Sequence, residues 1–201
     1  MITDALHRAL TAPGDPPLRP LPDEVAALLV TLHAPPRLAA HLRAVHDVAA
    51  QLTTALAERF PQLTVDRAAV LFGAATHDIG KVVHPAELSG PGSAHEIAGR
   101  ELLLRHGVPA TLARFAATHA AWREDGIDVD DLLVGVADKV WKGKRVGDLE
   151  DLVVDRLAAV TGRERWSVFL ELDEILDRIA ADADRRLAFQ ATHPVRAGRV
   201  P

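Results

Sequence analysis

The chain has 201 residues, of which 48% are hydrophobic and 25% charged, enough for one compact domain with a sizeable core. Its formal net charge of −5 contrasts with the basic surface of a general nucleic-acid-binding protein, so we expect no long nucleic acid as a partner. The chain has no cysteine and ten histidines. Disulfides, thiolate nucleophiles and cysteine-bound zinc are thereby excluded, and any metal must be held by nitrogen and oxygen.

The N-terminal residues predict neither a secretory signal nor a membrane span. Residues 1–10 lack a basic region followed by a long apolar run, and no uncharged apolar stretch approaches ~18 residues. We therefore expect a soluble, cytoplasmic protein with no membrane contact. Prolines cluster over residues 11–22, which predicts an extended lead-in over residues 1–21.

From Pro22 onward, apolar residues recur with a period of 3.6, which is typical of helices. The first helix begins at Pro22 and ends before Pro35 and Pro36. Further helices are predicted over residues 37–60, 66–79, 95–106, 109–122, 130–142, 148–160 and 166–189. The pattern predicts a single all-α domain over residues 22–190 and a flexible tail over residues 191–201.

Ligand-type residues interrupt the apolar faces of five helices. They are His41, His77 (followed at once by Asp78), His95, His119 and Asp138. A single such residue is more often a core polar group that hydrogen-bonds a backbone carbonyl, and His77 followed by an exposed Asp78 fits that interpretation too. Five that converge would be hard to satisfy without a metal.

The remaining histidines have simpler explanations. His7 and His193 lie near the termini, where we expect them to be solvated. His33 and His106 end helices, where the negative end of the helix dipole favours them. His84 precedes a proline and is expected to form a loop hydrogen bond.

The order His, His-Asp, His, His, Asp over several helices resembles the HD-domain superfamily of metal-dependent phosphohydrolases. The most specific piece is ATHDIGKVVHP at residues 75–85, which is similar to the family's HDIGK segment, and HExxG follows at residues 95–99. The resemblance covers residues 37–144. It implies a compact helical bundle, with additional C-terminal helices that either cover the core or form a homodimer face.

The resemblance also implies metal-binding roles. His77 and Asp78 match the defining pair, with Asp78 able to bridge two metals, and Asp138 matches the last ligand. His95 and His119 match the additional ligands of members with two metals. Family members with a His-His pair at the position of His119 would need a second histidine at position 120, where this chain has alanine. The GYP element of the cyclic-dinucleotide-cleaving branch is also missing.

Two histidines compete for the role of first ligand. His41 and His46 lie five residues apart on one helix and therefore on different faces. His41 fits the family pattern H-x-x-x-V-x-x-x-A better, whereas the long separation from His77 favours His46. With His41 as the ligand, His46 and Arg43 become candidates for substrate binding.

Several cations are candidates for binding phosphate. Lys81 matches a family lysine that contacts the scissile phosphate, so Asp78 and Lys81 are the expected catalytic residues. Lys139, Lys142 and Lys144 form a local basic segment in an acidic chain, which suits a phosphorylated substrate. They equally suit a solvated helix end.

Imidazole and carboxylate ligands suit Mn, Fe, Co, Ni or Zn, so we expect one or two divalent transition metals. Glu96, beside His95, is either a residue that orients this ligand or a solvated one. The resemblance implies a phosphohydrolase that acts with metal-activated water on a nucleotide or another small phosphorylated metabolite. The alternatives are a di-iron oxygenase and a non-catalytic metal- or nucleotide-binding regulatory module.

Overall fold

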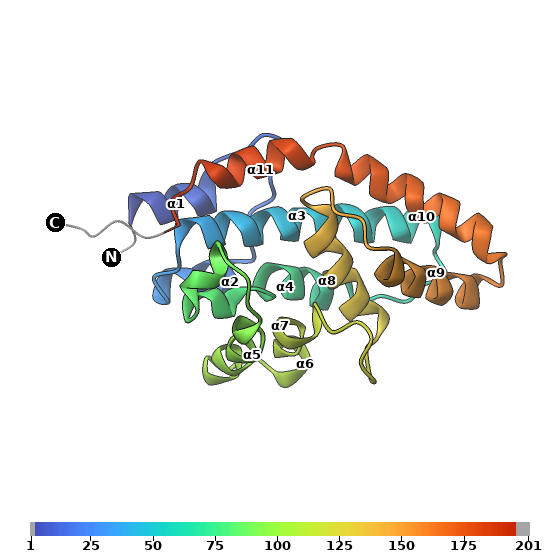
Figure 1. The fold of residues 1–201 in the computed structure, drawn as a ribbon, viewed down its shortest axis with the longest axis horizontal. Helices are drawn as coiled ribbons and strands as arrows, with labels where there is room; N and C mark the ends of the chain where they lie inside the picture. The colour runs from blue at the N-terminus through green and yellow to red at the C-terminus, as the bar shows by residue number, and fades with distance from the viewer. Residues whose placement is uncertain (1–2, 196–201) are drawn as a thin grey trace.

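The computed structural model describes residues 3–195, and over that range its regular elements are all helices, which confirms the predicted all-α class (Figure 1). The α-helices are α1 (Asp4–Thr11), α2 (Asp23–Thr31), α3 (Pro36–Arg59), α4 (Arg67–Thr76), α5 (Ala94–Arg105), α6 (Ala110–Ala113), α7 (Phe115–Thr118), α8 (Val129–Val140), α9 (Gly147–Thr161), α10 (Arg165–Ala180) and α11 (Ala183–Ala191). Two short 3₁₀ helices, η1 (Ile79–Val82) and η2 (Pro85–Leu88), lie between α4 and α5. Within the described residues, no helix combines the length and apolarity needed to cross a membrane.

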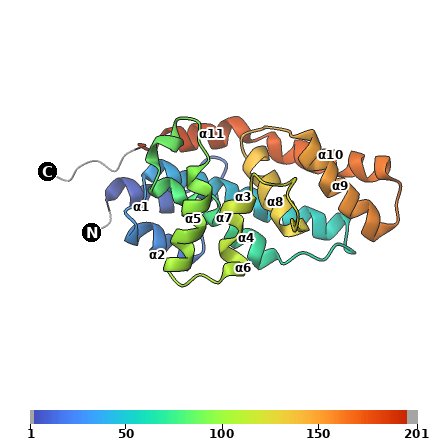
Figure 2. The same ribbon diagram turned by 60° about the horizontal axis from the view of Figure 1, so that its bottom comes forward.

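The 24-residue helix α3 forms the centre of the fold. Apolar residues such as Leu38, Leu42, Val45 and Leu52 are buried along its length, and a helix that is buried on most sides must be covered by other helices. Figure 1 shows α10 and α11 along one side of α3, with α4 and α8 along another, and all four helices contact it. Figure 2 shows α5 and α7 in front of this layer.

The N-terminal segment differs from the predicted extended lead-in. Residues Asp4–Thr11 form α1, which Thr3 caps by accepting a hydrogen bond from the backbone N–H of Leu6. Leu6 and Ala9 bury its apolar face. Proline restricts only itself and the residue before it, and the cluster starts at Pro13, so the prediction is wrong for α1.

The C-terminal segment also departs from the prediction. The helix predicted over residues 166–189 is broken between α10 and α11, where Arg186 donates a hydrogen bond to the carbonyl of Ile179 near the end of α10. At the end of α11, the side chain of Arg37 donates to the carbonyl of Ala191, the last residue of the helix, and to that of His193 just beyond it. The described start of the predicted flexible tail is therefore tied to α3, whereas residues 196–201 lie outside the described range.

Candidate metal centre

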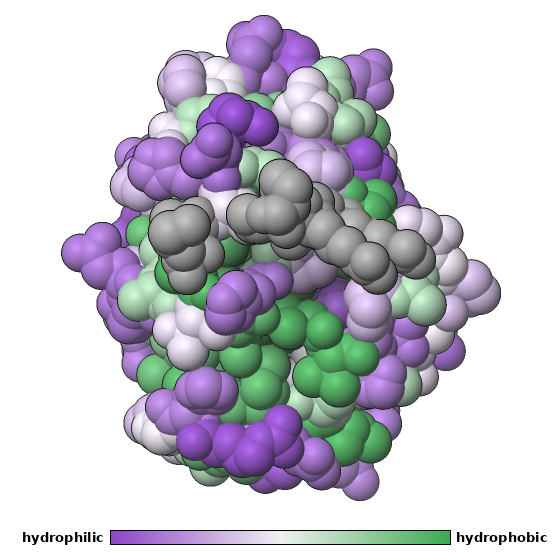
Figure 3. Space-filling view, turned by 90° about the vertical axis from the view of Figure 1, so that its left-hand side faces the viewer, coloured by the Kyte–Doolittle hydropathy of each residue, from purple (hydrophilic) through white to green (hydrophobic). Residues whose placement is uncertain are grey.

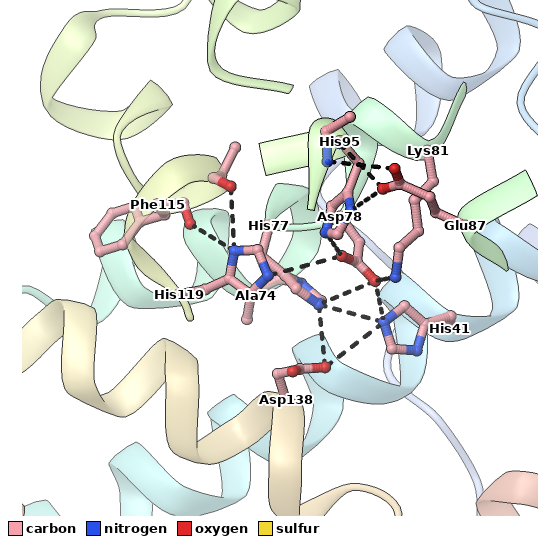
Figure 4. A network of polar contacts seen from close by, with 12 residues as sticks. His41, Ala74, His77, Asp78, Lys81, Glu87, His95, Phe115, His119 and Asp138 are labelled. Atoms are coloured by element: carbon pink, nitrogen blue, oxygen red, sulfur yellow. Dashed lines mark hydrogen bonds and ion pairs between the residues drawn. The ribbon is translucent and has the colours of Figure 1, made fainter. Parts of the chain in front are cut away.

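Six buried side chains meet in one cluster between the helices (Figure 4). They form two groups, one of His41, His77 and Asp138, the other of Asp78, His95 and His119. Within each group, one nitrogen or oxygen atom of each residue lies within 4.8 Å of the others. The six residues that the sequence pattern predicts as ligands thus lie together, with Asp78 between the two groups.

Glycines allow the helices that carry these residues to approach closely. A Cβ atom at Gly73 of α4 would lie 2.6 Å from the ring of Phe115 and 2.9 Å from the side chain of Val134. A Cβ atom at Gly80, directly after the His77-Asp78 pair, would overlap the main chain of α5 at His95. The backbone contact at Gly80 requires glycine and brings α5 close to the end of α4, while Gly73 leaves room for the side chain of Val134 on α8.

In the first group, two imidazoles and a carboxylate face one another. The Nε2 atoms of His41 and His77 are 3.2 Å apart, and His77 Nε2 lies 3.4 Å from Oδ1 of Asp138. The Nδ1–H of His77 donates to the carbonyl of Ala74 at 2.9 Å, which leaves its Nε2 with a lone pair. A lone pair that faces a second imidazole and a carboxylate is typical of a metal ligand.

The second group is arranged around Oδ1 of Asp78. The Nε2 atoms of His95 and His119 lie 3.0 Å and 3.8 Å from this oxygen. The Nδ1–H of His119 donates to the carbonyl of Ala116 at 3.1 Å, and that of His95 donates to Glu87 at 2.5 Å. Each Nε2 lone pair thus faces a carboxylate oxygen, and two acceptors that face each other need a proton or a metal ion between them.

The charge states of the cluster suit a metal. Burial lowers the pKa of His41, and burial together with the charge of His77 lowers the pKa of His119 to about 4, so both are neutral near pH 7. Burial alone would raise the pKa values of Asp78 and Asp138, but the facing histidines at Asp78, and His77 with Lys139 at Asp138, hold both pKa values well below the ordinary range. His95 differs, because burial is outweighed by the hydrogen bond and charge of Asp78 and the hydrogen bond of Glu87, which raise its pKa. Neutral imidazoles and ionised carboxylates are the forms that bind divalent metals, so a metal at His95 would displace a proton.

Glu87 is a residue of this centre that the sequence analysis missed. Its carboxylate accepts hydrogen bonds from the backbone N–H groups of Ala94 and His95 as well as from the His95 ring. Glu87 thus accepts the hydrogen bond that orients the His95 ring. The sequence instead suggests Glu96, the residue that follows His95, for this role. The only sequence signal is an acid shortly before a helix N-terminus, whose free N–H groups favour a carboxylate.

Two ammonium groups lie on the carboxylates of the cluster. Lys81 Nζ is 2.5 Å from Oδ2 of Asp78, and Lys139 Nζ is 2.6 Å from Oδ2 of Asp138. Their side chains are 18% and 16% exposed, so both lie at an edge that solvent reaches. Lys142 follows on the same helix end, near the ring of Trp141, and burial lowers its pKa. Lys144 is exposed, and within residues 3–195 no hydrogen bond or ion pair joins its side chain to the cluster.

Arg43 does not have the predicted position of a substrate-binding residue. Its guanidinium is buried and donates hydrogen bonds to the main-chain carbonyls of Ala9, Ala12, Leu18 and Arg19. These contacts fasten the N-terminal segment to α3. The prediction that Arg43 binds substrate is therefore wrong, because a guanidinium that donates to four main-chain carbonyls has no free N–H groups directed at a substrate phosphate.

The structure brings His41 into the cluster and leaves His46 on another face of α3. His46 is buried, and the charged groups that act on it are Asp47, Arg19, Arg67 and Arg43 rather than members of the cluster. Burial, the largest effect, lowers the pKa of His46 from 6.5 to about 4. His46 therefore lies in the position of a core residue, away from the edge where Lys81 and Lys139 lie.

This environment predicts a pH-dependent contribution of His46 to stability. The folded protein has the lower pKa, so the unfolded chain binds more protons between pH 6.5 and about 4. The free energy of unfolding therefore falls as pH falls through this window. We expect His46→Gln to reduce the loss between pH 7 and pH 4.5 by about 2 kcal/mol, measured by urea unfolding at each pH.

His106→Gln is the matched control, because His106 is exposed at the end of α5. It should leave the pH dependence of unfolding as it is in the wild type. An equal effect of both substitutions would show that burial of His46 does not cause the pH dependence.

His7, His33 and His106 are exposed, as expected for terminal and helix-end histidines. His193 is different, because it is only 6% exposed and its ring packs edge-on against Phe189. The expectation that His193 is solvated is therefore wrong. The short segment after α11 lies against the start of α3, where the backbone N–H of Arg37 donates to the carbonyl of Pro194.

Comparison with protein-family models matches residues 38–142 to the HD domain. The match spans just over half of the chain and includes all six clustered residues. No curated protein and no solved structure matches the chain.

Proposed function

Because this chain belongs to the HD domain family, we propose that it is a metal-dependent phosphohydrolase that acts on a nucleotide or another small phosphorylated metabolite. The observation that carries this proposal is the pair of buried histidine and aspartate groups joined by Asp78. Buried imidazoles with lone pairs directed at carboxylate oxygens are costly unless a cation lies among them.

The proposed metal ligands follow the two groups. His41, His77 and Asp138 would hold one divalent transition metal, His95 and His119 would hold a second, and Asp78 would serve both. When bound, such metals supply a water of lowered pKa and positive charge for the phosphoryl and leaving oxygens. With no thiolate present, Mn, Fe, Co, Ni and Zn all suit this set of nitrogen and oxygen ligands.

The chain's own residues orient the ligands and neutralise charge. The Ala74 carbonyl, Glu87 and the Ala116 carbonyl each hold one histidine in the tautomer that presents Nε2 to the centre. Lys81 and Lys139 already lie at the exposed edge, where their ammonium groups bind phosphoryl oxygens and stabilise the charge that develops during hydrolysis.

The basic segment continues beyond this edge. Lys142 and Lys144 lie outward of Lys139 on the same stretch of chain, where they suit the further phosphates of a nucleotide. Arg43 and His46 have no part in this proposal, because both are buried away from the edge.

The proposal is tested with protein purified in the presence of Mn, Co or Ni. We expect a metal-to-chain ratio near two and release of phosphate from at least one class among phosphomonoesters, nucleotides and cyclic nucleotides. A ratio near one would instead make His95 and His119 substrate contacts. Metal and nucleotide binding without turnover would support a regulatory module, and oxygen consumption by the iron-loaded protein would support an oxygenase.

The Glu87–His95 hydrogen bond leads to a separate prediction. Glu87→Gln preserves the size of the side chain but replaces the carboxylate that fixes the His95 tautomer. We expect metal affinity of the second group to fall about 10- to 100-fold, the usual effect of losing a partner that orients a ligand. Competition with a fluorescent chelator measures this affinity.

Glu101→Gln is the control, since Glu101 lies on α5, the helix that carries His95, but its side chain is exposed. It should bind metal as the wild type does. If Glu87→Gln also binds both metals with wild-type affinity, the orienting role of Glu87 is excluded.

A further inference from the structure

A cavity of about 690 Å³ lies between α1 and α11, apart from the metal centre. Its walls are mostly apolar and include Ala12, Pro13, Ala188, Phe189 and Pro194. None of the six clustered residues lines it. Figure 3 shows the side of the molecule where α1 and the end of α11 lie, with apolar residues exposed among hydrophilic ones.

A buried polar residue without a partner lines this cavity. His193 packs edge-on against Phe189, and its Nε2 atom has no hydrogen-bond partner in the described part of the chain. Burial, reinforced by the positive charges of Arg43, Arg8 and Arg37, lowers its pKa, so the ring is neutral near pH 7. A buried polar atom that lacks a partner lowers the stability of the fold, and most such atoms in proteins hydrogen-bond to protein, water or a ligand.

The charges around the cavity favour an anion. Arg8 of α1 lines the cavity and is exposed, and no ion pair or side-chain hydrogen bond engages it within residues 3–195. Arg185 also lines the cavity but is already paired with Asp15 and Asp182. Among residues 3–195, the charge of Arg8 therefore has no partner at this cavity, and the buried guanidinium of Arg43 adds to the positive potential at His193.

We propose that this cavity binds a small amphipathic anion, with its apolar part against Ala188 and Phe189 and its acidic group near Arg8 and His193. The volume lies in the range of about 300–1,000 Å³ that is typical of small-molecule sites. The proposal does not depend on the proposed phosphohydrolase activity.

The test is isothermal titration calorimetry on the full-length, metal-loaded protein. The probes are decanoate and decyltrimethylammonium, which have similar apolar chains and opposite charges. We expect decanoate to bind with a stoichiometry of one per chain and decyltrimethylammonium to bind at least about tenfold more weakly. Metal content, measured on the same samples, shows that the metal centre is intact.

Two variants locate the binding. Arg8→Gln removes a positive charge at an exposed position, and Ala188→Trp fills the cavity from the surface of α11. Each should weaken decanoate binding about tenfold or more, whereas Arg100→Gln, at an exposed arginine of α5, should have no effect. The proposal is overturned if decanoate does not bind, if both probes bind equally, or if neither variant weakens binding. Tighter binding after deletion of residues 196–201 would overturn it as well, by showing that the tail is the occupant.

Discussion

Asp78→Asn is expected to remove both metals and to lower the kcat/KM of phosphate ester hydrolysis at least about 1,000-fold, because metals supply several kcal/mol of transition-state stabilisation. Asp78 is the residue that joins the two groups. Its Oδ1 faces His95 and His119, and its Oδ2 lies 3.0 Å from Nε2 of His41 and contacts Lys81. An amide has nearly the same shape, but it lacks the charge and one of the two acceptors.

Elemental analysis measures the metal-to-chain ratio of this variant, and phosphate release measures its activity. Asp125→Asn is the control, because Asp125 is exposed in the loop before α8 and makes no ion pair among the described residues. It should retain both metals and full activity. Wild-type activity in Asp78→Asn, with an unchanged far-UV circular dichroism spectrum, would refute the proposed metal-dependent mechanism.

Gly80→Ala is expected to destabilise the protein by at least about 3 kcal/mol, at the upper end of the cost of overpacking. The added Cβ atom would overlap the main chain of His95 and lie 2.6 Å from the backbone nitrogen of Gly99. Neither group is the end of a flexible side chain, so α5 has to move away as a unit. That movement carries His95 away from Asp78, and metal binding by the second group should weaken together with stability.

Gly147→Ala is the matched control at the first residue of α9. Nothing lies within 4 Å of a Cβ atom at this position, so alanine should be neutral or slightly stabilising. Urea unfolding and metal titration of both variants measure the two effects. If Gly80→Ala is as stable as the wild type, the close packing of η1 against α5 is not needed for the fold.

The sequence by itself determined the fold class and predicted most of the residues that lie together in the buried cluster. The 3.6-residue period of apolar positions requires helices whatever their arrangement, and it marked His77, His95, His119 and Asp138 as polar residues on buried faces. The spacing around HDIGK then related these residues to one family. These signals are local in sequence, which is why they could be interpreted without knowledge of which helices pack together.

Only the tertiary structure decided between residues whose local patterns are alike. His41 and His46 share one helix, and the choice depends on which face α4 and α8 cover. Arg43 has the charge of a phosphate ligand, yet the return of residues 9–19 along α3 gives it main-chain carbonyls to bind.

The hydrogen-bond partner of His95 also depends on the tertiary structure, because Glu87 lies in η2 and contacts the His95 ring on α5. Periodicity describes one helix at a time. Such partners are set by contacts between segments distant in sequence, and for that reason only the packed structure fixes them.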